Sequence, residues 1–136
     1  MLDEPSRRPH EYKYNQLNHH VYPTLFIVLF VLILVHEWGH FIVAKKTGMR
    51  VDEFGIGFPP KLFGIKRGET EYTFNLLPIG GFVKILGENG VDGETLSETD
   101  RARAFSARPR FAQALVLVAG VAMNILFAWF LFVLVL

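Results

Sequence analysis

The chain has 136 residues, a formal net charge of +1 and no cysteine, and 51% of its residues are hydrophobic. The lack of cysteine excludes disulfides and thiol chemistry within these residues, and the near-neutral charge gives no indication of nucleic-acid binding. The hydrophobic residues are concentrated in two long runs, which predicts a membrane protein of mainly helical class.

Residues 1–21 precede the first run and are expected to form a tail outside the cytoplasm, with 1–16 lacking fixed structure. His19 and His20 are candidate metal ligands. With Tyr22, however, they are better interpreted as interfacial residues near the membrane surface. His20 precedes the next histidine by 16 residues, about 24 Å along a helix, so it is not expected to share a metal site with it.

The first apolar run extends from Thr24 to Ala44 and contains the sequence HEWGH. About 20 residues are needed to cross roughly 30 Å of hydrocarbon, so we expect a transmembrane helix over residues 22–46. A cleavable signal peptide fits poorly, because the run begins late in the chain. It is also followed by Lys45 and Lys46 instead of a small-residue cleavage site.

On this helix His36 and His40 lie about 40° apart, with Glu37 beside them. In H-E-x-x-H sites the two imidazoles bind Zn²⁺ and the glutamate handles the proton of a water molecule. The sequence therefore predicts a zinc-dependent hydrolase with Glu37 as the catalytic residue. Trp38 falls on the far side of the helix, and Gly39 leaves room for a closely packed neighbouring helix.

Two other interpretations of the same residues remain open. Ionisable side chains inside a membrane span are costly, so the cluster could be a buried polar network that joins helices. It could equally belong to a proton or ion pathway. The pathway gives no reason for the spacing of His36, Glu37 and His40.

Residues 47–87 show strand signals, because Tyr72, Phe74 and Leu76 alternate with polar residues and glycines mark turns. We expect a small antiparallel sheet of three or four short strands: 51–56, 61–66, 70–77 and 82–86. The following residues 88–110 are predicted to form a polar, mobile linker that ends in a short basic interfacial segment.

The second apolar run predicts another transmembrane helix over residues 111–136. Of the 14 Lys and Arg residues, 11 lie between the two helices, which places the 45–110 loop in the cytoplasm. The run ends the chain without polar flanking residues, so we expect this chain to be an N-terminal fragment of a longer protein.

The sequence from Val35 to Ala128 resembles the site-2 protease family of intramembrane zinc metalloproteases, in particular its bacterial regulator-of-sigma-E protease branch. The resemblance rests on four segments, which are HEWGH, FGIGFPPKLF, GETEYTFNLLPIGGFVKILGE and RAFSARPRFAQALVLVAGVAMNILFA. It implies location in the bacterial inner membrane. It also implies cleavage of transmembrane segments of membrane-anchored regulators or of signal-peptide remnants.

The resemblance also implies a membrane-re-entrant hairpin over residues 71–86, which presents the substrate as an added strand. A family pattern G-P-x-x-N is matched by Gly120 and Asn124, with Val121 in place of proline. With Gly80 and Gly81, these residues are expected to bind substrate or support the active site. Gly120, Asn124 and Ala128 form a ridge expected to pack on Gly39, and Asn124 could alternatively serve only as an interhelical hydrogen bond.

Family members complete the zinc site with an aspartate in an L-D-G motif on a later span, and many carry a PDZ-type domain. Neither feature occurs in this chain, and the loop carboxylates Asp92, Glu94, Glu98 and Asp100 offer no evident substitute. Catalytic zinc normally has three protein ligands, so we expect the isolated chain to bind zinc weakly and to be inactive. The alternative is a non-catalytic membrane scaffold or a degenerate relative.

Overall fold

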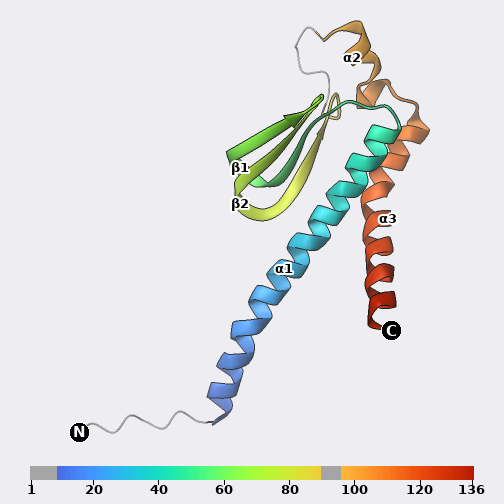
Figure 1. The fold of residues 1–136 in the computed structure, drawn as a ribbon. Helices are drawn as coiled ribbons and strands as arrows, with labels where there is room; N and C mark the ends of the chain where they lie inside the picture. The colour runs from blue at the N-terminus through green and yellow to red at the C-terminus, as the bar shows by residue number, and fades with distance from the viewer. Residues whose placement is uncertain (1–8, 90–95) are drawn as a thin grey trace.

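The computed structural model describes residues 9–89 and 96–136, with side chains from residue 20 onward. The elements follow in the order α1 (Pro9–Lys46), β1 (Val51–Arg67), β2 (Thr70–Ile85), α2 (Glu98–Ala102), a 3-10 turn η1 (Phe105–Ala107) and α3 (Arg110–Val135). The C-terminal half of α1 lies between the sheet and α3 (Figure 1).

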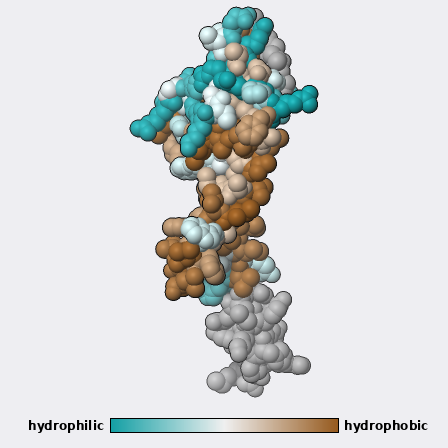
Figure 2. Space-filling view, turned by 90° about the vertical axis from the view of Figure 1, so that its right-hand side faces the viewer, coloured by the Kyte–Doolittle hydropathy of each residue, from teal (hydrophilic) through white to brown (hydrophobic). Residues whose placement is uncertain are grey.

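Two helical segments, His20–Lys46 of α1 and Arg110–Val135 of α3, have the length and hydropathy of membrane spans. Only 6% of the most apolar window of the first and 17% of that of the second are buried within the chain, unlike core helices of soluble proteins. Figure 2 shows the hydrophobic surface below a hydrophilic cap. The two expected spans are therefore present as helices, with the first helix extending back to Pro9.

A close contact between backbones holds the two helices together. A Cβ atom at Gly39 of α1 would lie 2.5 Å from the carbonyl oxygen of Ala119 and 2.9 Å from Cβ of Met123 on α3. The expected role of Gly39 in close helix packing is thus confirmed. At the loop end, this contact is continued by a small buried core of Ala44, Met49, Val51, Ile85, Ala112 and Val116.

The sheet consists of two long strands that both bend. Residues 51–56 of β1 pair antiparallel with 81–85 of β2, and 61–67 of β1 pair antiparallel with 70–75 of β2. Residues 53–56 also pair with 71–74. In this pairing residue 53 lies opposite 71 and residue 56 opposite 74, so the two segments are parallel. The four segments of the expected sheet are thus present, in a single layer with 81–85 at one edge.

The expectation of three or four separate strands is wrong, because neither Gly57–Pro60 nor Pro78–Gly81 ends a strand. Gly57 and Gly80 both have φ +79°, a conformation open to glycine that lets each strand bend while pairing continues around irregularities in register. The two bends, at residues 57–60 and 78–81, form one end of the sheet, which we call the sheet tip.

Two expectations about irregular segments are also wrong. Residues 9–16, expected to lack structure, are part of α1, while residues 1–8 lie outside the described residues. Of the predicted mobile linker, residues 90–95 lie outside the described residues, and its later part contains α2. The first turn of α2 is capped by the Ser97 hydroxyl, which accepts a hydrogen bond from the backbone N–H of Asp100 at 3.1 Å. A serine followed three residues later by an acidic residue is a helix-start signal that the composition of the segment concealed.

A charged cluster joins the end of α1 to the loop. Glu69 accepts a 2.7 Å contact from Nζ of Lys45 and contacts of 2.6 and 2.8 Å from the guanidinium of Arg103. The Arg103 and Lys45 hydrogen bonds lower the pKa of Glu69 to about 2. Arg103 and Arg108 both donate to the carbonyl oxygen of Gly48, just beyond the end of α1, and so tie the start of the loop to the segment that leads into α3.

Replacing Glu69 with glutamine should lower the free energy of unfolding at pH 7 by about 1 kcal/mol or less, since these side chains are partly exposed. The folded pKa lies below the ordinary value of 4.5, so the contribution is complete above pH 4.5 and is lost as the pH falls toward 2. Denaturation in detergent micelles between pH 7 and pH 2 measures this difference. Glu71→Gln, which removes a more exposed pair with Lys61, should cost less at pH 7. A deficit of Glu69→Gln that persists unchanged at pH 2 would contradict the assignment.

Candidate functional site

The two histidines of HEWGH lie on the face of α1 that meets α3. Their ring centroids are 4.7 Å apart with an interplanar angle of 76°. Nδ1 of His40 lies 2.7 Å from the carbonyl oxygen of Val116, across the helix interface. A carbonyl only accepts, so this contact requires a proton on Nδ1, and in the neutral ring the lone pair of His40 then lies on Nε2.

Gly120 shows where the two imidazoles point. A Cβ atom placed on Gly120 would lie 2.5 Å from Nε2 of His36 and 2.6 Å from Nε2 of His40. Both nitrogens therefore converge on one small space beside α3, and that space is open only because residue 120 lacks a side chain. The expected packing of Gly120 on Gly39 is wrong. Gly39 instead meets Ala119 and Met123, the residues directly before Gly120 and Asn124 in the chain.

Glu37 lies half-buried on the side of α1 that faces the sheet tip. A Cβ atom on Gly81 would be 3.9 Å from Cγ of Glu37 and 3.0 Å from the Leu34 side chain. Gly80 packs in the same way against Ile33, at 3.2 Å. The structure thus places Gly80 and Gly81, the two glycines predicted from the sequence, against Ile33, Leu34 and Glu37 on α1.

Asn124 lies on α3, one turn beyond Gly120. Its Oδ1 atom is buried and has no hydrogen-bond partner among the described residues. A buried acceptor without a partner costs free energy, so such an atom is suited to receive a donor from a bound molecule. The alternative role, an interhelical hydrogen bond, would require a donor for this oxygen, and none of the described residues supplies one.

The arrangement of donors is suited to a metal ion. Two imidazole nitrogens converging on one space suit first-row divalent ions, and the carbonyl that orients His40 is the kind of outer contact found at such sites. Among the described residues no group of three His, Cys, Asp or Glu side chains could hold a metal. His36 and His40 could therefore supply two ligands, and the described residues supply no third.

Comparison with known proteins agrees with this geometry. Residues 24–136 match the model of peptidase family M50, the site-2 protease family. The chain belongs to this family, which confirms the resemblance seen in the sequence.

Several curated bacterial relatives share the matched segment. The chain is 51% identical over 102 residues to a Clostridium perfringens protein provisionally named a zinc metalloprotease, covering 75% of this chain and 28% of that protein. It is 41% identical over 111 residues to one from Thermotoga maritima with the same provisional name, covering 78% and 22%. It is 54% identical over 65 residues to zinc metalloprotease RasP of Oceanobacillus iheyensis, covering 47% and 15%. The chain thus spans less than a third of the length of these relatives.

Gly120→Ala is expected to weaken binding of a divalent ion roughly tenfold or more, because the new methyl group would occupy the space shared by both Nε2 atoms. Alanine is the better helix former, so α3 itself should not be destabilised. Metal content and the absorption spectrum of bound Co²⁺ in the full-length gene product measure the effect. Ala122→Val, on the exposed face of α3, is the matched control. Unchanged Co²⁺ spectra in Gly120→Ala would show that the metal does not lie between these nitrogens.

Proposed function

We propose that this chain is the part of an intramembrane zinc metalloendopeptidase that activates water. The observation that carries the proposal is the convergence of Nε2 of His36 and Nε2 of His40 beside Gly120, with Glu37 facing the sheet tip. Membership of peptidase family M50 and the names of the relatives support it.

In this proposal His36 and His40 hold the ion. Bound zinc supplies Lewis acidity, which polarises a carbonyl group and makes water more acidic. Glu37 takes the proton of the attacking water and delivers it to the leaving amine, as a general base and then a general acid. Val116 holds His40 in the required tautomer through its carbonyl. Asn124 offers its buried Oδ1 to a donor of the bound peptide.

The substrate is a transmembrane segment that has unwound into an extended strand. Residues 81–85 pair with β1 along one edge, and no strand of the described chain pairs with their other edge. A substrate strand added there would satisfy its own backbone groups and bring a peptide bond beside Glu37. Gly80 and Gly81 let the sheet tip approach α1 closely enough for this arrangement.

We place the site inside the bilayer. Glu37 precedes Lys46 by nine residues, about 14 Å along the helix axis, so the sheet tip reaches a similar depth and re-enters the membrane. The exposed hydrophobic residues of the tip region suit that location, including Phe58, Leu62, Phe63, Leu76, Leu77 and Ile79. The protein would lie in a bacterial inner membrane with the 45–110 loop in the cytoplasm, following the excess of basic residues there.

The full activity requires a longer protein. We propose that later spans supply the third zinc ligand and that a PDZ-type domain accompanies them, so residues 1–136 alone are inactive. The physiological substrates would be membrane-anchored regulators or signal-peptide remnants. A non-catalytic scaffold is the competing proposal.

Glu37→Gln separates the enzyme from the scaffold. In the full-length gene product this variant should retain bound zinc and lose cleavage of a model transmembrane substrate by about a hundredfold or more, the usual contribution of general acid–base catalysis. Metal analysis and product quantification by gel electrophoresis measure the two properties. Glu98→Gln, on exposed α2, should leave both unchanged. Wild-type cleavage by Glu37→Gln would refute the enzymatic proposal.

The orientation can be tested because residues 1–136 contain no cysteine. Arg67→Cys, at the exposed end of β1, should react with a membrane-impermeant maleimide only after the inner membrane is opened. Tyr22→Cys, near the start of the first span, should react in spheroplasts with an intact membrane. Mass-shift gels report the labelling, and the opposite pattern would invert the proposed topology.

A further inference from the structure

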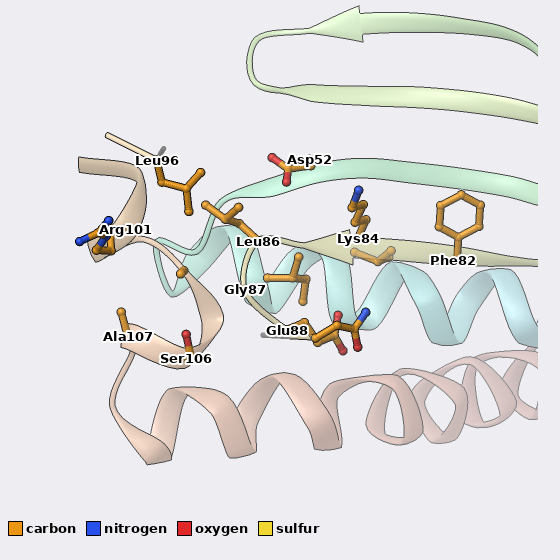
Figure 3. Close-up of a pocket in the computed structure, with 14 residues that line it drawn as sticks. Asp52, Phe82, Lys84, Leu86, Gly87, Glu88, Leu96, Arg101, Ser106 and Ala107 are labelled. Atoms are coloured by element: carbon orange, nitrogen blue, oxygen red, sulfur yellow. The ribbon is translucent and has the colours of Figure 1, made fainter. Parts of the chain in front are cut away.

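Two adjoining cavities lie between β2 and the segment that leads into α3. One has a volume of about 480 Å³ and is lined by Lys84 and Glu88 from the β2 side and by Arg101, Ser106 and Ala107 from the opposite side (Figure 3). The other, of about 620 Å³, extends to Arg110 and Gln113 on α3. Both are lined by Gly87, Glu88 and Ser106, so together they form one depression, which we call the cap cleft.

Strand β2 leads from the candidate catalytic site to the cap cleft. Phe82 lines the cleft, and its neighbour Gly81 faces Glu37. From Gly81 to Ile85 the strand rises about 13 Å toward the polar end of the molecule. A strand added along this edge with a peptide bond at Glu37 would therefore reach the charged part of the cleft, near Lys84 and Glu88, after roughly four to six further residues.

The charges of the cap cleft are predominantly basic. Lys84, Arg101 and Arg110 line it, are exposed, and form no ion pair among the described residues. By contrast, four other basic side chains of the loop region are bound to carboxylates, namely Lys45, Arg50, Lys61 and Arg103. The cleft contributes two carboxylates, and that of Asp52 is already bound to Arg50. Along the described lining, an incoming peptide would therefore meet three cations and one carboxylate without an ion pair there, Glu88.

We propose that the cap cleft binds the polar flank of the substrate on the loop side of the scissile bond and selects flanks that carry acidic residues. This inference rests on the proposed function and adds a criterion for the substrate. Lys84, Arg101 and Arg110 are specificity-determining residues, and none of them takes part in the chemical step.

Selection of acidic flanks would distinguish substrates from most other membrane spans. Membrane spans commonly carry an excess of Lys and Arg at their cytoplasmic ends. A basic cleft repels those flanks, so most spans that diffuse past the sheet edge would be poorly held. Specificity is a difference between affinities, and repulsion of the common competitor contributes to it as much as attraction of the correct substrate.

The test uses two model transmembrane substrates that differ only in the six residues flanking the span on the loop side, either Asp- and Glu-containing or Lys- and Arg-containing. The full-length gene product should cleave the acidic form with a kcat/KM about three- to tenfold higher, and the ratio should shrink in high salt. K84E/R110E should remove or reverse the preference. K66E/R67E, which changes the same number of charges on the far edge of the sheet, should keep it.

Position can be tested without catalysis. Ser106→Cys in the Glu37→Gln background should form a disulfide with a substrate that carries one cysteine four to six residues from the scissile bond. Lys66→Cys should not. Equal cleavage of both substrates by the wild type, or cross-linking at Lys66→Cys alone, would overturn the cleft assignment. Loss of the proposed function would instead appear as normal cleavage by Glu37→Gln, so the two failures are distinguishable.

Discussion

The site depends on the close approach of α1 to α3, which only glycines permit. Gly39 brings the helix backbones together, and Gly120 leaves the space on which both histidine Nε2 atoms converge. Because lipid tails are as apolar as leucine, helices in a bilayer gain little from hydrophobic burial, and contact between small residues becomes a main source of association. The close approach that joins the helices therefore also creates the space on which the two imidazoles converge.

Much of the site could be predicted because its information is local in sequence. The spacing of His36 and His40 and the apolar residues around them determine both the helix and the shared face. The partner of each glycine was harder to predict, because a shift of one residue on α3 rotates the contact by about 100°. This is why Gly120 was expected against Gly39 and is found against the histidines. The Val116 carbonyl carries no side-chain signal at all.

The sheet was less predictable for a similar reason. Alternation and turn residues located its four segments, but positive φ at Gly57 and Gly80 allows the chain to bend without ending a strand. The parallel contact between 53–56 and 71–74 joins segments that are not consecutive, so no local pattern indicates it. Helix α2 was missed because its capping signal lies in a polar, glycine-containing stretch.

The contact of His40 with Val116 has a further meaning for how the site is assembled. Among the described residues, α3 contributes a carbonyl that orients His40 and a position without a side chain beside the two imidazoles. If α3 slid along α1 by one residue, His40 would lose its acceptor and a side chain would enter the space beside the imidazoles. The affinity of the two histidines for an ion would therefore depend on the register between α1 and α3, and a displacement of about 1.5 Å would change it.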